Sequence, residues 1–262
     1  MDSGLLASLG PGMTRENKMS YAELAVTTNF SFLRGAAHPE ELVATADELG
    51  LAAIGIADRN SFAGVVRAYS EARTRKIKLV VGVRLVTVDG FELLAYSIDR
   101  AAYGRLCRLL SAGNLKAKKG ECHLTFEEIL AASAGQMLIA LPPSARPHEG
   151  GDPALNSRFR RNEWEINDFS KRLSTLARAA PGRTFLAGAH YHCGDEARRL
   201  RLLAELGERL DAPLVAVNDV LYHAPERRPL ADVVTCIREK CTIAEAGLRL
   251  AVNAERHLKS PA

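Results

Sequence analysis

Acidic and histidine side chains follow several short apolar runs in this 262-residue sequence, at points where buried strands would end. Carboxylate and imidazole groups are common protein ligands of divalent cations, and a multinuclear metal centre needs several of them to converge. Ligands in α/β proteins gather at the carboxyl ends of the strands. The candidates for such a centre are Asp58, Asp219, His190 and His192.

Arginines share the same predicted strand ends and oppose that chemistry. Arg34, Arg59 and Arg84 each follow or end an apolar run. A guanidinium group remains cationic, cannot ligate a metal ion and repels one. The residue types therefore argue against a full metal cluster. The arginines can instead pair with Asp58 and Asp219, or hold a phosphate through two parallel hydrogen bonds.

Two further groups of residues leave alternatives open. In an extended segment, His190 and His192 present both rings on one face, which suits a metal, although an ordinary surface pair has the same pattern. The basic run at 116–119 is either a solvated loop or a contact for nucleic acid. Its cationic members are Lys116, Lys118 and Lys119.

Other catalytic signatures are missing from the sequence. It has no G-x-S-x-G nucleophile elbow, no phosphate-binding loop of the G-x-x-x-x-G-K-[ST] type and no G-x-G-x-x-G motif. It also lacks the cluster of three acidic residues that a two-metal nucleotidyl transferase needs. No catalytic residue is therefore assigned.

Composition limits the class of protein. A hydrophobic fraction of 47% and a charged fraction of 25% suit one large globular domain or two small ones. The net charge of +4 permits an anionic partner without requiring one. No apolar run is long enough to span a membrane, and no signal peptide is evident. The odd number of cysteines, five, and the absence of a C-x-x-C pair favour reduced thiols in a cytoplasmic protein.

The elements that must position the candidate residues alternate between strand and helix. Apolar runs predict strands at 23–28, 52–57, 78–83, 137–141, 184–187 and 214–217, with a hairpin of 84–87 and 91–96 around Asp89-Gly90. Helices are predicted from Pro39, at about 61–76, after Asp99 with Tyr103 facing inward, after a Thr125–Glu128 capping box, at 161–179, at 195–210, and from Pro229 with Thr242 or Asn253 as later caps.

Six or seven β-then-α units of this kind predict an α/β fold with a parallel sheet closed into a barrel. Residues 1–18 lack periodicity and contain Gly4, Gly10, Pro11 and Gly12, so they are predicted to be a disordered leader. Met19 is an alternative start of the protein.

Several stretches resemble the amino-terminal PHP (polymerase and histidinol phosphatase) domain of C-family bacterial DNA polymerases, and most closely the error-prone, damage-inducible type. They are YAELAVTTNFSFLRGAAHPEELV (21–43), GIADRNSFAG (55–64), KLVVGVRLVTVDG (78–90), DRAAYGRLCRLLSAGN (99–114), VNDVLYHAPERRPLADVVTCIREKCTI (217–243) and NAERHLK (253–259). The resemblance implies a distorted β/α barrel of the (β/α)7, TIM-like type over residues 19–243, with 244–262 beginning the connection to a polymerase palm.

The resemblance also identifies where metal ligands would stand. Asp58 and Asp219 match the family's pattern, whereas most other ligand positions do not. The departing positions are Ala25, Thr27, Arg34, Arg59, Arg84 and Leu221. The same arginines, with Lys116, Lys118 and Lys119, are the candidates for contact with an anion or DNA.

From the resemblance we expect a non-catalytic scaffold in translesion DNA synthesis, in a chain that ends before the palm and needs no cofactor of its own. Magnesium or manganese would serve only the full-length polymerase. The expected partners are the palm and thumb, DNA, and accessory proteins of damage-induced mutagenesis. The alternatives are a residual metal-dependent phosphoesterase or 3'-5' exonuclease, and a weak nucleic-acid-binding module.

Overall fold

The computed structural model describes residues 21–143, 158–192, 194 and 196–261, with no side-chain description for 158–166. The predicted leader at 1–18 lies outside these residues. Seven strands form one sheet in the order of the chain: β1 (Ala22–Val26), β2 (Ala53–Arg59), β3 (Lys78–Val86), β4 (Glu92–Ser97), β5 (Gln136–Leu141), β6 (Thr184–Gly188) and β7 (Leu214–Ala216).

The sheet is mixed: the β-then-α units predicted parallel pairing, and the hairpin predicted around Asp89-Gly90 interrupts it with an antiparallel strand. β4 pairs antiparallel with both β3 and β5, while the other neighbours are parallel. The physical reason is the predicted tight turn at Asp89-Gly90, where Gly90 takes a φ of +87°. A turn this short can join only antiparallel strands, because a parallel pair needs a crossover.

Among the residues that the structure describes, one bridge joins the two ends of the sheet. Val26, the last residue of β1, pairs in parallel with Val220, four residues after β7. The Thr27 N–H donates to the Val220 carbonyl at 2.9 Å, and the Val220 N–H donates to the Ala25 carbonyl at 2.7 Å. The distorted, TIM-like α/β barrel is therefore confirmed, with its last side held by one bridge instead of a regular ladder.

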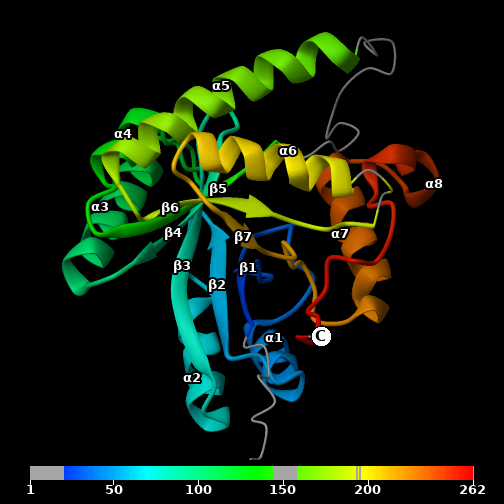
Figure 1. Cartoon of the computed structure of the whole chain (residues 1–262). Coiled ribbons are helices and arrows are strands. Elements are labelled where there is room, and N and C mark those ends of the chain that lie inside the picture. The colour runs from blue at the N-terminus through cyan, green and yellow to red at the C-terminus, as the bar shows by residue number, and fades with distance from the viewer. Residues whose placement is uncertain (1–20, 144–157, 193, 195, 262) are drawn as a thin grey trace, which may run out of the picture.

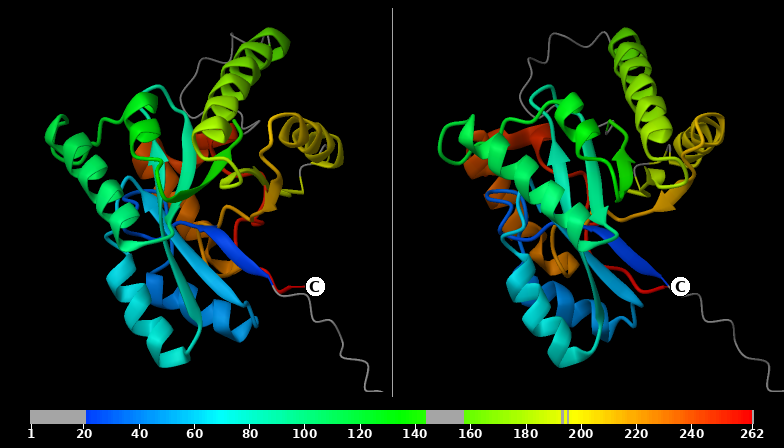
Figure 2. Two further views of the ribbon diagram at one scale, coloured as in Figure 1. Left: turned by 60° about the vertical axis from the view of Figure 1, so that its left-hand side comes forward. Right: turned by 90° about the vertical axis from the view of Figure 1, so that its left-hand side faces the viewer.

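Helices surround this sheet (Figures 1 and 2). They are α1 (Pro39–Glu48), α2 (Val65–Arg75), α3 (Arg100–Leu115), α4 (Phe126–Ala131), α5 (Arg158–Ala179), α6 (Glu196–Arg209), α7 (Arg228–Glu239) and α8 (Ile243–Ala246), with single 3-10 turns at Pro225–Arg227 and Gly247–Arg249. Within the described part of the chain, no helix has both the length and the apolarity that crossing a membrane requires.

Local signals in the sequence explain most helix boundaries. The Asp99 side chain accepts from the Ala102 N–H at 2.6 Å, and Thr125 and Glu128 form the predicted capping box. Two expectations were wrong: the second helix begins at Val65 instead of 61, and Tyr103 is 38% exposed. Of the two alternative later caps, Thr242 caps α8, whereas Asn253 starts no helix and its side chain donates to the Tyr191 carbonyl at 2.6 Å.

The inside of the barrel is filled by side chains from alternate strand positions. Ala57, Leu94, Tyr96 and Val217 belong to this inner cluster. The ring of Tyr96 occupies the space over β3, since a Cβ added at Gly82 would lie 2.2 Å from it. The interior is thus packed as in other small barrels, and any chemistry must take place at the mouth above it.

Candidate functional site

Strand alternation directs a set of charged side chains to the barrel mouth. Arg59 lies two residues after inward-facing Ala57, and Arg84 lies two after Gly82. Asp219 lies three residues beyond β7 with a φ of +49°, and its contact with Arg84 places it beside them. Successive side chains of a strand point to opposite faces. These three residues therefore form the layer directly above the packed interior, where the sequence predicted a site.

Asp219 is held by groups of the protein itself. Its carboxylate accepts from Arg84 Nη1 at 2.7 Å, from Arg256 Nη2 at 2.5 Å and from the Tyr191 hydroxyl at 3.2 Å. The side chain is only 4% exposed. Charge-assisted hydrogen bonds of this length are strong, so both carboxylate oxygens of Asp219 are already engaged.

Glu92, at the start of β4, extends the network. Arg84 Nε donates to Glu92 Oε2 at 2.7 Å, and Arg59 Nη1 donates to Glu92 Oε1 at 3.3 Å. Burial alone would raise the pKa of Glu92, but the charges of Arg84 and Arg59 outweigh it and hold that pKa below 4.5. Burial alone would lower the pKa of Arg84, but Asp219 and Glu92 raise it above its usual value.

Asp58 has a separate environment without a cation. Thr28 donates to its carboxylate through the backbone N–H at 2.9 Å and through the hydroxyl, and the Ser31 hydroxyl donates at 2.7 Å. Burial raises the pKa of Asp58 despite these hydrogen bonds, which act in the opposite direction. A Cβ added at Gly64 would lie 2.4 Å from Asp58 Oδ2, so the pocket is closed on that side too.

The two aspartates therefore differ in how they are neutralised. Pairing with arginine, one alternative from the sequence, is found for Asp219 through Arg84. The same expectation is wrong for Asp58, because Arg59 follows it in the strand and points to the other face.

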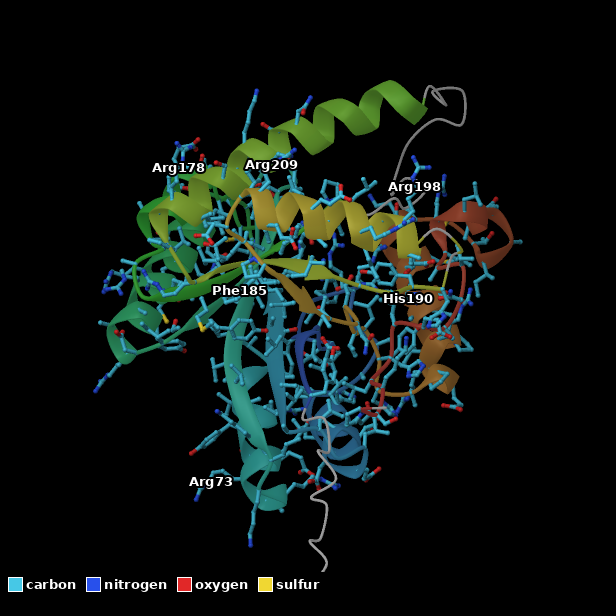
Figure 3. The ribbon with its side chains drawn as sticks, viewed as in Figure 1. Arg73, Arg178, Phe185, His190, Arg198 and Arg209 are labelled. Carbon is cyan, nitrogen blue, oxygen red and sulfur yellow. The ribbon has the colours of Figure 1, made fainter. Side chains whose placement is uncertain are left out.

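His190 lies just beyond the carboxyl end of β6 (Figure 3), and His192 follows two residues later. Their ring centroids are 4.3 Å apart, so the rings do share one side, and both residues are exposed. His192 Nε2 lies 3.6 Å from Glu255 Oε2. Of this segment, it is the intervening Tyr191 that contacts Asp219.

The other predicted positions carry few groups that could act on a ligand. Ala25 and Thr27 are buried, and Leu221 packs partly buried against the core beneath α1. Arg34 is half-buried, and its backbone N–H donates to the Ser31 carbonyl at 2.9 Å. On the basic loop Lys116 pairs with Glu128, whereas Lys118 and Lys119 are exposed.

A metal centre fits these residues poorly. Among the residues with a described placement, no three or more His, Cys, Asp or Glu side chains group so that they could hold an ion. Asp219 would have to give up Arg84 and Arg256 before it could bind one. Fixed cations at this mouth also repel dications. The charged side chains at the mouth pair with one another. Among the described residues, the mouth offers no pair of free carboxylates for metal-assisted hydrolysis.

Sequence reasoning missed Glu92, Arg256 and Tyr191. Glu92 has a detectable signal, since it lies just after the Asp89-Gly90 turn, two residues before the inward-facing Leu94 that pairs with Arg84. Arg256 has none, because it is 37 residues from Asp219 and reaches it only through the bridge that pairs Tyr222 with His257. The segment after residue 243, expected to begin a connection, contributes buried Arg256 and Leu258 to this unit.

Residues 23–185 match the model of the family described as the PHP domain. The chain is 50% identical over 242 residues to an error-prone DNA polymerase of Caulobacter vibrioides, which covers 92% of this chain and 21% of that protein. An error-prone DNA polymerase of Rhodopseudomonas palustris is 46% identical over 94% of this chain and 24% of its own length. The chain thus spans only about a fifth to a quarter of the relatives it matches.

Two solved structures share the fold at low sequence identity. A crystal structure assigned as a metal-dependent phosphoesterase from Bifidobacterium adolescentis superposes with a TM-score of 0.51 and 17% identity, over 76% of this chain and 87% of that one. An amidohydrolase from Chromobacterium violaceum gives 0.52 and 15%, over 78% and 88%. These likenesses support the barrel architecture alone.

Proposed function

The chain belongs to the PHP domain family, and from that premise we propose that it serves as the PHP domain of an error-prone DNA polymerase, in the role of a non-catalytic scaffold. The similarity to error-prone polymerases over more than nine-tenths of the chain supports the polymerase context. The observation that carries the scaffold role is Asp219, whose two oxygens are bound by Arg84, Arg256 and Tyr191.

In this proposal the mouth stabilises the domain instead of acting on a substrate. Arg84 joins β3 to β4 through Glu92 and to the segment after β7 through Asp219. It thereby links the β3–β4 hairpin to the segment after β7 across the barrel mouth. A domain locked in this way can present a constant surface to the rest of a polymerase.

The wider context follows from the relatives and belongs to the same proposal. The chain would act with the palm and thumb of the polymerase, on DNA, in translesion synthesis and repair of damaged templates. Magnesium or manganese would be bound by the polymerase palm, and this domain would bind neither. Accessory proteins of induced mutagenesis are further proposed partners, and the proposed location is the cytoplasm.

Metal analysis combined with a hydrolysis assay tests the scaffold role. The purified chain is dialysed against Mn²⁺ or Zn²⁺, its metal content is measured, and bis(p-nitrophenyl) phosphate is offered as substrate. We expect no stoichiometric metal and no hydrolysis above the buffer rate. Several bound ions per chain, with hydrolysis that disappears in Asp219→Asn, would instead establish the residual phosphoesterase.

A nucleic-acid-binding role is the weaker alternative, because Arg59, Arg84 and Lys116 already pair with carboxylates. Only weak DNA binding is expected, and it should decline steeply with salt, as phosphate contacts do. Fluorescence anisotropy with a labelled single strand at two salt concentrations measures this. Tight binding that survives high salt would favour the nucleic-acid module.

A further inference from the structure

Helix α7 is oriented in an unusual way. A surface helix of a globular protein normally turns its apolar stripe to the core and its charges to water. Here Leu230, Val233 and Ile237, at helical spacing, are 42%, 39% and 57% exposed. Later in the chain, three more apolar residues are exposed: Ile243 by 57%, Leu248 by 70% and Val252 by 71%. We call these six residues the α7–α8 face.

The charged residues of the same helix bind to the domain. Arg227 pairs with Glu41 of α1. Arg228 donates to the carbonyl of Ala251, and Arg238 donates to the carbonyl of Leu33 at 2.9 Å. The orientation of α7 is therefore fixed by arginines on its inner side, and the apolar side chains are held outward by that attachment.

Three of the exposed residues line a groove. Val233, Ile237 and Ile243 line it together with Cys236, at the junction of α7 and α8. An exposed apolar patch with a rim of polar residues is typical of a protein-interaction site. Lys240 and Glu245 also line this groove, as in interfaces with an apolar centre and a polar rim.

The comparisons show where this surface lies relative to the matched segments and how much of the relatives lies outside the match. The family model ends at residue 185, before α7 begins. The alignment with the Caulobacter vibrioides polymerase includes 242 of the 262 residues, so it must include α7. The α7–α8 face thus begins in the part of the chain that is shared with polymerases and lies beyond the family model. About four-fifths of those polymerases lies outside the match.

We propose that the α7–α8 face is the docking surface for the remainder of an error-prone polymerase, the part that relatives possess outside the segment matched here. This inference rests on the proposed function and specifies which surface makes the contact. The occupant would present complementary apolar side chains to the groove.

Cysteine labelling in two settings tests the assignment. This chain is used by itself and as a replacement for the matching segment of the full-length Caulobacter vibrioides polymerase. Leu248→Cys reports on the face, and Val66→Cys on α2, which is 73% exposed, is the matched control. A maleimide modifies both, and peptide mapping separates these sites from the native thiols.

We expect Leu248→Cys to react rapidly in the separate chain and at least about tenfold more slowly in the chimera, since thiol reactivity requires access. Val66→Cys should react at the same rate in both. Adding Ile237→Arg to the Leu248→Cys chimera should restore rapid labelling, because a charge in the groove opposes docking, while Val66→Arg should leave labelling slow.

The outcomes separate the two proposals. A chimera that synthesises DNA but labels Leu248→Cys rapidly would overturn the docking surface and leave the proposed function intact. A chimera that folds but synthesises no DNA would contradict the proposed function and the docking surface with it. Slow labelling in the separate chain, together with sedimentation as a dimer that Ile237→Arg dissociates, would assign the face to a second copy instead.

Discussion

The barrel mouth and the α7–α8 face satisfy their side chains in opposite ways. At the mouth, Arg84 is 14% exposed and Asp219 4%, and each contacts oppositely charged groups of the same chain. On the α7–α8 face, Leu248 is 70% exposed and meets water. The charges of the first region pair within the domain, whereas the second region exposes apolar side chains to solvent.

This difference indicates where function lies in the molecule. Members of a fold family carry their activities in sites placed on a common architecture, and here the expected site has been converted into internal ion pairs. A buried pair stabilises only when its charges and hydrogen bonds are all matched, and the contacts of Arg84 meet that condition. In the proposal made above, the domain instead interacts with a partner through the α7–α8 face.

The largest expected effect comes from removing the central cation of the mouth. Arg84→Ala should lower the free energy of unfolding by about 3–5 kcal/mol, because it leaves the partly buried Glu92 carboxylate with Arg59 as its remaining arginine and removes one of the donors to the buried Asp219 carboxylate. Urea unfolding followed by circular dichroism measures the loss. Lysine at this position keeps the positive charge but lacks the several N–H donors of arginine. The free energy of unfolding of Arg84→Lys should therefore lie between those of the wild type and Arg84→Ala. A midpoint equal to the wild type would show that the network adds nothing.

Asp58 should give the second largest loss. Asp58→Ala leaves the Thr28 and Ser31 donors without their buried acceptor, and we expect a loss of about 2–3 kcal/mol. Asp58→Asn keeps one acceptor oxygen and should lose less. The same urea titration gives both values. If Asp58→Ala were as stable as the wild type, the buried hydrogen bonds would have no net value.

Acidification should weaken the mouth through Glu92. The pKa of Glu92 is lowered in the folded state, so its contribution is present above pH 4.5, the ordinary value, and is lost as pH falls below it. The stability difference between the wild type and Glu92→Gln should therefore shrink from pH 6 to pH 3. Unfolding free energies at several pH values measure it. A difference that stays constant with pH would mean that Glu92 is not held ionised by Arg84.

The smallest effect on stability is expected for a substitution on the α7–α8 face. Ile237→Ser should change the stability of the separate chain by no more than about 0.5 kcal/mol, because the residue is 57% exposed and has little burial to lose. Thermal unfolding measures this. The same exchange at Ile56, which is fully buried, should cost several times more. A large loss at Ile237 would show that the α7–α8 face is packed within the domain.

The local sequence determined most elements and the residue types at the mouth. The Asp89-Gly90 hairpin, the Asp99 cap and the Thr125–Glu128 capping box each depend on residues close together in the chain, and each is present in the structure. The order of apolar runs indicated the barrel, and the arginines at strand ends already opposed a metal cluster.

Only the tertiary structure decided which charges meet and which surfaces remain open. Arg256 reaches Asp219 because the segment after α8 returns to the barrel, and no periodicity in the sequence encodes that return. The apolar stripe of α7 likewise has the pattern of a core-facing helix. Its outward orientation follows from the contacts of Arg227, Arg228 and Arg238 with other parts of the chain. The hydrophobic periodicity identifies the apolar side of a helix, but it does not decide whether that side faces the core or the solvent.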